Sequence, residues 1–248
     1  MNQSDQWTPS KYVRLGKRWA GSRDISELGA GSRLIADRTA ELYAEYLPRH
    51  ARGRLVDLGC GKAPLYGLYG PLASDVTCAD WPQSVHASPY LDRAVDLNGP
   101  LPFADAAFDT IVLSDVLEHL SAPQALWNEM ARVLAPGGHA FVNTPFLYGI
   151  HEAPHDYARY TEFGLRRFAR QSGLDVVTLV AVGGSLEVMA DLLGKHLAQV
   201  PAVGATLAAG LQGAVAMFGR TPWGERLAAR TAAHFPLGYF MVATRPAR

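Results

Sequence analysis

A glycine turn between acidic positions is the first chemical signal in this sequence. A short apolar run ends in Asp57 and is followed by Gly59 and Gly61, and two further apolar runs close with Asp80 and Asp96. A residue without a Cβ atom can adopt positive φ and lets a ligand approach the backbone. Carboxylates accept hydrogen bonds from hydroxyl and amino groups. The pattern therefore indicates a loop that binds a ligand carrying such groups.

The elements that must position these residues alternate along the chain. Apolar runs indicate strands at 55–58, 75–80, 93–97, 108–114, 139–144, 174–182 and 237–244. Helical spacing indicates helices at 32–46, where Pro48 would end the helix, at 122–134, and after the capping residue Thr161. This alternation predicts an α/β fold with a mostly parallel sheet and helices on both faces. The carboxyl ends of the strands would then form the ligand-binding edge.

The composition is typical of a globular protein and argues against a disordered chain and against a nucleic-acid-binding protein. The chain has 248 residues, of which 48% are hydrophobic and 19% charged, so it is neither disordered nor short of core. Its formal net charge is zero, which does not favour a nucleic-acid partner. Its two cysteines, Cys60 and Cys78, form no CxxC motif and are expected to be reduced. With no signal peptide visible in the polar first residues, we expect a cytoplasmic protein.

Three units divide the chain. Residues 1–50 form an N-terminal helical segment or lid, residues 51–184 and 235–248 form the core, and residues 185–234 form a helical insertion. About fifty residues between the sixth and seventh strands are too many for a simple hairpin. Within the first unit, the basic and aromatic stretch 11–19 is expected to be a solvated turn or helix. The alternative for this stretch is a lid over a cofactor or a contact with an anionic substrate.

Several motifs occur in a fixed order through the core. They are VDLGCG at 56–61, Asp80, Asp96-Leu97, LPFADAAFD at 101–109, LSDVLEHL at 113–120 and RVLAPGG at 132–138. In this order the sequence resembles the class I S-adenosylmethionine-dependent methyltransferases. The resemblance implies a Rossmann-like seven-stranded sheet with an antiparallel last strand. It also implies S-adenosyl-L-methionine as the cofactor and S-adenosyl-L-homocysteine as the product.

The resemblance also assigns residues to the cofactor. The implied set is Asp57, Gly59, Cys60, Gly61, Asp80, Trp81, Asp96, Leu97, Ser114 and His119. The glycine loop would meet the amino acid end, Asp80 the ribose hydroxyls, and Asp96 with the Leu97 backbone the adenine edge. Trp81 would pack on the adenine face. The third glycine of the family's loop is Ala63 here, a small change that should be tolerated. The alternatives without a binding role are that Asp57 caps a turn, that Asp96 is an acidic residue of a turn and that His119 is a packing residue.

A nicotinamide-dependent Rossmann oxidoreductase is the alternative for the glycine loop. That fingerprint requires a third glycine and helix N–H groups facing a pyrophosphate. Pro64 occupies the position of the third glycine of that fingerprint, and the 132–138 motif is not typical of nicotinamide-dependent enzymes. The alternative is therefore disfavoured.

The segment 143–161, after the fifth strand, is dense in ionisable and aromatic side chains. We expect a general base for an oxygen or nitrogen nucleophile among His151, His155, Asp156 and Tyr157. The bland alternative is that His155, Asp156 and Arg159 form a hydrogen-bonded network that shapes the loop. A metal held by His151, His155 and Asp156 is a further alternative. We expect no metal, because nothing in the sequence fixes their geometry and methyl transfer does not require one.

The insertion carries a stretch, 196–219, without Asp, Glu, Lys or Arg. Its length suits a membrane span, but its many Ala and Gly residues and its place between two strands do not. We expect helices that form a cap over the substrate pocket. A dimer interface or a peripheral contact with a membrane or a lipid-linked substrate is the alternative.

These observations favour a methyltransferase acting on a small-molecule, glycan-linked or lipid-linked acceptor, at oxygen. The alternative from another class is a non-catalytic cofactor-binding or scaffold protein with the same fold. We expect no nucleic-acid partner and no transmembrane span, and a homodimer stays open. The sequence does not identify the acceptor.

Overall fold

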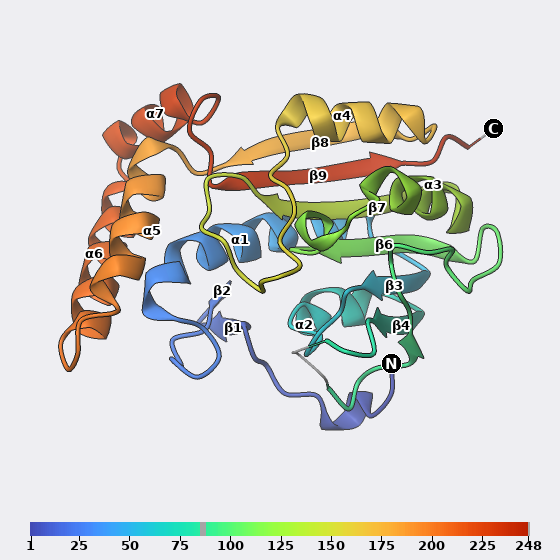
Figure 1. Ribbon diagram of the computed structural model, residues 1–248, viewed down its shortest axis with the longest axis horizontal. Coiled ribbons are helices and arrows are strands. Elements are labelled where there is room, and N and C mark those ends of the chain that lie inside the picture. The colour runs from blue at the N-terminus through green and yellow to red at the C-terminus, as the bar shows by residue number, and fades with distance from the viewer. Residues whose placement is uncertain (85–87, 248) are drawn as a thin grey trace.

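The computed structural model describes residues 1–84 and 88–247 and is built around one seven-stranded sheet (Figure 1). Its strand order is β5-β4-β3-β6-β7-β9-β8. The strands are β3 (Arg54–Leu58), β4 (Asp75–Asp80), β5 (Arg93–Ala94), β6 (Phe108–Ser114), β7 (Leu134–Pro145), β8 (Asp175–Val182) and β9 (Gly238–Thr244). β9 pairs antiparallel with β7 and β8, and the other pairs are parallel. The predicted fold class is confirmed.

The chain reverses its direction across the sheet beside β3. It proceeds from β3 outward to β4 and β5, then returns to lay β6 on the other side of β3. The register places Asp57 opposite both Cys78 of β4 and Val112 of β6. The carboxyl ends of these three strands therefore meet at a topological switch point, where open α/β sheets bind their ligands.

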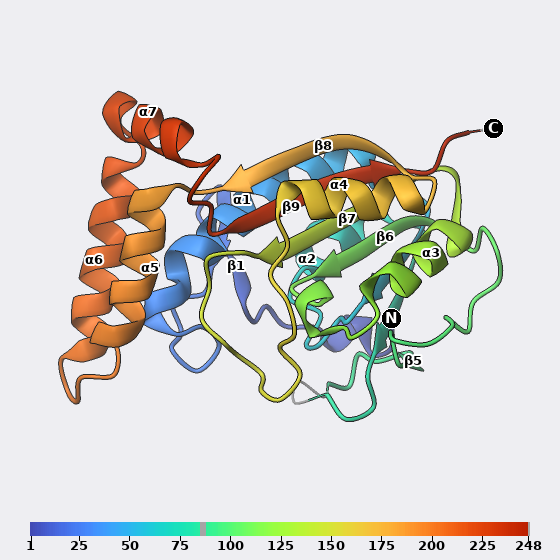
Figure 2. The ribbon, with the colours of Figure 1, turned by 45° about the horizontal axis from the view of Figure 1, so that its top comes forward.

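Helices cover both faces of the sheet because successive strand residues point to opposite sides. Ile111 packs with α3 (Pro123–Val133) and α4 (Glu162–Gln171) in one core. Its neighbour Val112 packs with α1 (Arg33–His50) and α2 (Tyr66–Tyr69) in a second core. Figure 2 shows α3 and α4 in front of the sheet and α1 behind it. Both cysteines are free and buried.

The N-terminal segment departs from expectation in two places. The stretch expected to be a turn or helix is an antiparallel hairpin of β1 (Tyr12–Leu15) and β2 (Arg18–Gly21). Tyr12 is buried on one side of this hairpin, so packing decides its conformation. α1 also continues through Pro48 to His50, beyond the expected end. Leu47, fully buried beside that proline, holds the last turn in place.

Three helices form the expected insertion between β8 and β9. They are α5 (Ser185–Leu197), α6 (Gly204–Phe218) and α7 (Pro222–Thr231). α5 and α6 stand beside the carboxyl ends of the parallel strands, at the left of Figure 1. α5 approaches the start of α1 so closely that a Cβ on Gly31 would lie 2.7 Å from the Lys195 nitrogen. Within the described residues, no helix is long and apolar enough to cross a membrane.

The side chain of Gln212 fastens the insertion to α1. Its oxygen accepts a hydrogen bond from the Leu34 amide at 2.8 Å, and its nitrogen donates to the carbonyls of Gly31 and Ala190 at 2.9 Å. Gln212 is 3% exposed. A buried amide with all these partners fixes the orientation of α6 against its neighbours, because leaving any of them unpaired is unfavourable.

Candidate functional site

A cavity of about 590 Å³ lies at the carboxyl ends of the central strands. One wall is the loop after β3, and the end of β4 and the segment after β5 form the next two. The short helical turn Leu117–His119 after β6 and the segment 152–157 after β7 complete it. A second cavity of about 270 Å³ shares Gly59, Gly61, Asp115 and Glu152 with it. The two spaces therefore meet at the glycine loop.

The glycine loop is folded back onto the end of β4. The Gly59 amide donates to the Ala79 carbonyl at 2.7 Å, and the Gly61 amide donates to Oδ2 of Asp80 at 2.8 Å. Gly59 has φ +75°, and a Cβ there would lie 2.3 Å from Cγ2 of Val116. Only glycine fits this turn without strain or displacement. Ala63, which replaces the family's third glycine, is buried with φ +47°, so the turn tolerates a methyl group there.

Four of the residues assigned to the nucleoside end of the cofactor line the larger cavity: Asp80, Trp81, Asp96 and Leu97. Asp80 accepts hydrogen bonds from the Gly61 and Trp81 amides, which fix its carboxylate. Asp96 is exposed and accepts from the Asn98 amide at 2.9 Å. The Trp81 ring stands edge-on to the ring of His155, with centroids 5.2 Å apart. These residues therefore line the same cavity.

Asp57, Cys60 and Ser114 line the smaller cavity instead. Asp57 is 3% exposed and accepts a hydrogen bond from the Tyr69 hydroxyl at 2.7 Å. Burial raises the pKa of Asp57 to about 7. The Tyr69 hydrogen bond opposes this rise, and the nearby Asp80 adds to it. This carboxyl is therefore poised to change its charge near neutral pH.

An ion pair that was not expected from the sequence crosses the smaller cavity. Nζ of Lys11 lies 2.7 Å from Oδ2 of Asp115, although the two are 104 positions apart. The Asn143 amide donates to the other oxygen of Asp115 at 2.6 Å, and Asp115 itself has φ +56°. The basic stretch at 11–19 was the only sequence signal for Lys11. Its partner is determined by tertiary structure.

The loop between β7 and α4 holds the four expected catalytic residues in different settings. His155 and Tyr157 line the larger cavity, and Nδ1 of His155 lies 3.1 Å from the Tyr157 hydroxyl. Asp156 is held on both oxygens by Arg159 and accepts from the His151 amide at 2.9 Å. The Arg159 guanidinium keeps the pKa of Asp156 well below its usual range, although burial opposes this. Asp156 thus shapes the loop, and its role in catalysis stays a prediction.

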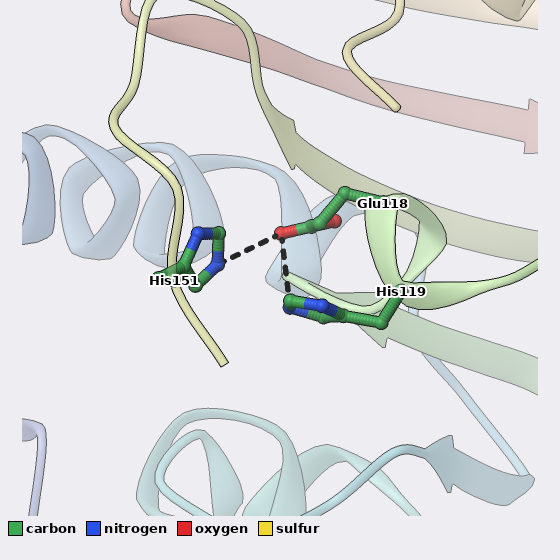
Figure 3. Close-up of side chains that lie close together, drawn as sticks. All are labelled: Glu118, His119 and His151. Carbon is green, nitrogen blue, oxygen red and sulfur yellow. Dashed lines mark ion pairs between the residues drawn. The ribbon is translucent and has the colours of Figure 1, made fainter. Parts of the chain in front are cut away.

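His151 belongs to a cluster with Glu118 and His119 (Figure 3). Nε2 of His151 lies 3.6 Å from Oε1 of Glu118, and Nε2 of His119 lies 3.8 Å from the same oxygen. Glu118 is fully buried. Burial raises its pKa, and His151 acts in the opposite direction. The pKa of His151 is raised by Glu118, with burial opposing. The sequence analysis named both histidines as site residues but not Glu118. The only indication of a role for Glu118 in the sequence was its position next to His119.

Comparisons with known proteins concern the domain and the fold. A family model described as a methyltransferase domain matches residues 56–142. A ubiquinone biosynthesis O-methyltransferase from Cupriavidus pinatubonensis is 27% identical over 156 residues, 51% of this chain and 61% of that protein. An uncharacterized methyltransferase from Mycobacterium sp. strain JLS is 42% identical over 78 residues, 29% of this chain and 31% of that protein. The chain therefore spans less than two thirds of each of these relatives.

A solved structure supports the fold over a larger part of the chain. The S-adenosylmethionine dependent methyltransferase from Mesorhizobium loti superposes with a TM-score of 0.54 at 16% identity. The superposition covers 86% of this chain and 100% of that one. At this identity the likeness concerns the fold alone. Together, the matched domain, the strand order and the shared fold support the expected class I S-adenosylmethionine-dependent methyltransferase family, with residues 56–142 matching its methyltransferase domain.

Proposed function

We propose that this protein transfers a methyl group from S-adenosyl-L-methionine to a hydroxyl oxygen of a small-molecule, glycan-linked or lipid-linked acceptor. One observation carries the proposal. Asp80 ends β4, Asp96 follows the neighbouring strand β5, and both line one cavity together with Trp81, beside the glycine loop. This places acceptors for a ribose diol and an exocyclic amine next to an aromatic surface, which matches the nucleoside end of the cofactor.

The smaller cavity suits the amino acid end of the same cofactor. Asp57 and Asp115 supply carboxylates, and Lys11 supplies an ammonium group on the same lining. A free amino acid group carries both charges, so its ammonium would meet a carboxylate and its carboxylate would meet Lys11. Because the two cavities share Gly59 and Gly61, the sulfonium would lie beside the glycine loop.

Methyl transfer to oxygen requires positioning and the removal of one proton. The acceptor oxygen forms a bond to the methyl carbon while the carbon–sulfur bond breaks and its electron pair returns to sulfur. In our proposal His155, which lines the larger cavity, takes the hydroxyl proton. Holding the oxygen in line with the methyl group supplies much of the remaining rate enhancement. The relatives named as ubiquinone biosynthesis O-methyltransferases support oxygen as the methylated atom.

Exposed apolar side chains on the helical insertion support an acceptor with an apolar part, or a partner with an apolar surface. Five of its large apolar side chains are each more than half exposed, namely Met189, Leu193, Val203, Met217 and Trp223. Scattered apolar residues are common on surfaces, and these five would indicate an interaction site if they form one continuous patch. We therefore keep the expected role of this unit as a cap or an interface as part of the proposal.

The test measures cofactor binding and turnover separately. S-adenosyl-L-methionine and S-adenosyl-L-homocysteine are titrated by calorimetry into the wild-type protein, Asp80→Asn and Asp75→Asn. Loss of charge-assisted hydrogen bonds to the ribose should weaken binding by the Asp80 variant at least about tenfold. Asp75 is exposed at the opposite end of the same strand, so its variant should bind like wild type.

Turnover is then measured with methyl-labelled cofactor and a panel of phenols, sugars and polyprenyl-linked glycans. Label transferred to an oxygen, and lost with His155→Ala at unchanged cofactor affinity, is the expected result. Equal cofactor affinity in wild type and the Asp80 variant would overturn the site assignment. Tight cofactor binding without transfer to any acceptor would favour the non-catalytic alternative.

A further inference from the structure

We propose that Glu118, His119 and His151 bind a divalent transition metal ion, of the zinc class, at the acceptor side of the cofactor cavity. Each residue offers one ligand atom, and the three atoms lie within 4.8 Å of one another. Figure 3 shows the Glu118 carboxylate directed between the two imidazole rings. Tetrahedral metal ligands at about 2.0–2.1 Å lie roughly 3.4 Å apart. The 3.6 and 3.8 Å separations from Oε1 of Glu118 therefore need only a small contraction, and the two imidazole nitrogens, which lie within 4.8 Å of each other, would also have to approach.

The outer nitrogen of each ring is already held by the protein. Nδ1 of His119 lies 2.9 Å from the carbonyl oxygen of His155. Nδ1 of His151 lies 3.3 Å from the Gly149 carbonyl and 3.4 Å from a carboxylate oxygen of Asp156. A carbonyl or carboxylate at Nδ1 keeps the proton there and leaves the Nε2 lone pair free toward the cluster. Metal-binding histidines are oriented by such contacts.

Two of the three atoms that face the centre of the cluster make no hydrogen bond. Among the residues that the structure describes, Oε1 of Glu118 and Nε2 of His119 make no hydrogen bond. The other oxygen of Glu118 accepts from the Thr144 hydroxyl at 3.3 Å. A cation at this point would stabilise the ionised form of the buried Glu118 carboxyl. His151 alone, 3.6 Å from Oε1 of Glu118, leaves Nε2 of His119 without a hydrogen bond, whereas one metal ion would bind all three atoms.

The donor set and its position define the ion and its use. Two imidazoles and one carboxylate are typical of catalytic zinc sites and of non-haem iron sites, which keep an open position. His119 lines the larger cavity, in which the proposed function places the nucleoside end of the cofactor and, beside His155, the acceptor hydroxyl, so an open position would face this cavity. Resting on the proposed function, we infer that the acceptor oxygen occupies this position and that the metal lowers the pKa of its hydroxyl. Glu152 is a further carboxylate, 3.9 Å from Nε2 of His119.

The experiment measures metal binding without reference to turnover. Chelator-treated protein without a histidine tag is titrated with Zn²⁺ against a chromophoric competitor, and Co²⁺ is added separately as a spectroscopic probe. We expect one tight site per chain and intense visible Co²⁺ bands of low coordination number. His151→Ala and Glu118→Gln should each weaken Zn²⁺ binding at least about 100-fold, the upper end of the loss seen when only a supporting contact of a ligand is removed.

Two variants guard against misfolding and unspecific binding. Glu118 is buried and its variant can unfold, whereas His151 is partly exposed on a loop, so His151→Ala decides the result if the Glu118 variant is unstable. His196→Ala, an exposed histidine on α5, should bind Zn²⁺ as tightly as wild type. Wild-type affinity no greater than that of His151→Ala, or equal weakening by His196→Ala, would overturn the metal site.

Failure of the metal site and failure of the proposed function are distinguishable in the same samples. Each preparation is also titrated with S-adenosyl-L-homocysteine before Zn²⁺ is added. Cofactor binding and methyl transfer that continue in metal-free protein without tight Zn²⁺ binding would remove the metal inference alone. Tight Zn²⁺ binding lost in His151→Ala, in a protein that binds no cofactor, would support the metal site and remove the proposed methyl transfer.

Discussion

Asp57 is the residue whose chemistry depends most on its place in the fold. Its position near the end of a buried strand deprives it of solvent, and the Tyr69 hydroxyl replaces only one hydrogen bond. The charged form is therefore disfavoured, and the pKa rises to about 7. An ammonium group placed in the smaller cavity would reverse that preference, because an opposite charge favours the ionised form.

Cofactor affinity should therefore depend on pH through Asp57. Below pH 7 the free protein carries a protonated Asp57, so binding the cofactor's ammonium group must release a proton. Affinity should fall by up to about tenfold for each pH unit below 7, and it should fall again above about pH 8, where the cofactor's own ammonium group loses its proton. Calorimetry between pH 5.5 and 8.5, in buffers of different ionisation enthalpy, measures both the affinity and the proton release. Asp57→Asn should remove the slope below pH 7, and an unchanged slope there in that variant would exclude Asp57 as its source.

At the scale of elements, the glycine loop is held between β4 and the segment after β6. Gly59 combines a positive φ with close contact to the Val116 side chain, whereas Gly16, in the hairpin turn, has φ +63° and open space where a Cβ would lie, with no described atom within 4 Å. Both glycines have a backbone conformation that is strained for other residues, but only at Gly59 would a Cβ also collide with a neighbour. Comparing them therefore separates backbone strain from steric exclusion.

Gly16→Ala and Gly59→Ala should therefore differ in stability. A left-handed conformation disfavours alanine by about 1–2 kcal/mol, which is the expected loss at Gly16. Gly59→Ala adds overpacking of about 1–3 kcal/mol and should displace the cofactor loop. Urea unfolding measures both variants. Combining Gly59→Ala with Val116→Ala should recover the packing part only, and equal losses at the two glycines would show that the contact with Val116 relaxes freely.

Local pattern was sufficient to predict β4 and β6 at the cofactor site, but β5 ends at Ala94 and not at residue 97 as expected. β4 and β6 have the bounds expected from their apolar runs, because both are buried strands that end in polar residues. The same pattern could not reveal that Glu118 meets His151, or that Lys11 meets Asp115. Those contacts depend on how the 146–161 loop and the N-terminal hairpin return to the sheet edge. The hairpin itself was missed because its alternation is short and interrupted by charges.

At the scale of the whole molecule, the insertion and α1 behave as one connected unit. Gln212 joins α6 to the start of α1 and to α5 through three hydrogen bonds. Gly31 allows α5 to approach α1 within contact of its backbone. Because α1 also packs against the sheet, the orientation of the insertion is transmitted to the core through this contact.

Gln212→Leu should loosen this connection. The substitution leaves the Leu34 amide and the carbonyls of Gly31 and Ala190 without their partner, a loss of roughly 2–4 kcal/mol. Hydrogen exchange should become faster in α5 and α6 than in β6, which lies in the centre of the sheet. Gln199→Leu, an exposed glutamine on the same insertion, should change stability by less than about 0.5 kcal/mol. Uniform acceleration throughout the chain would show that the insertion does not open separately.

The position of β9 also determines when the sheet can be completed during synthesis. β8 pairs with β9, and β9 lies between β7 and β8 although it follows the whole insertion in the chain. A ribosome therefore delivers β8 and then α5, α6 and α7 before the strand that joins β8 to β7 emerges. Until that moment the edge of β7 is uncovered, and β8 has no neighbour in the sheet. The nascent chain must protect an open sheet edge through the translation of the entire insertion.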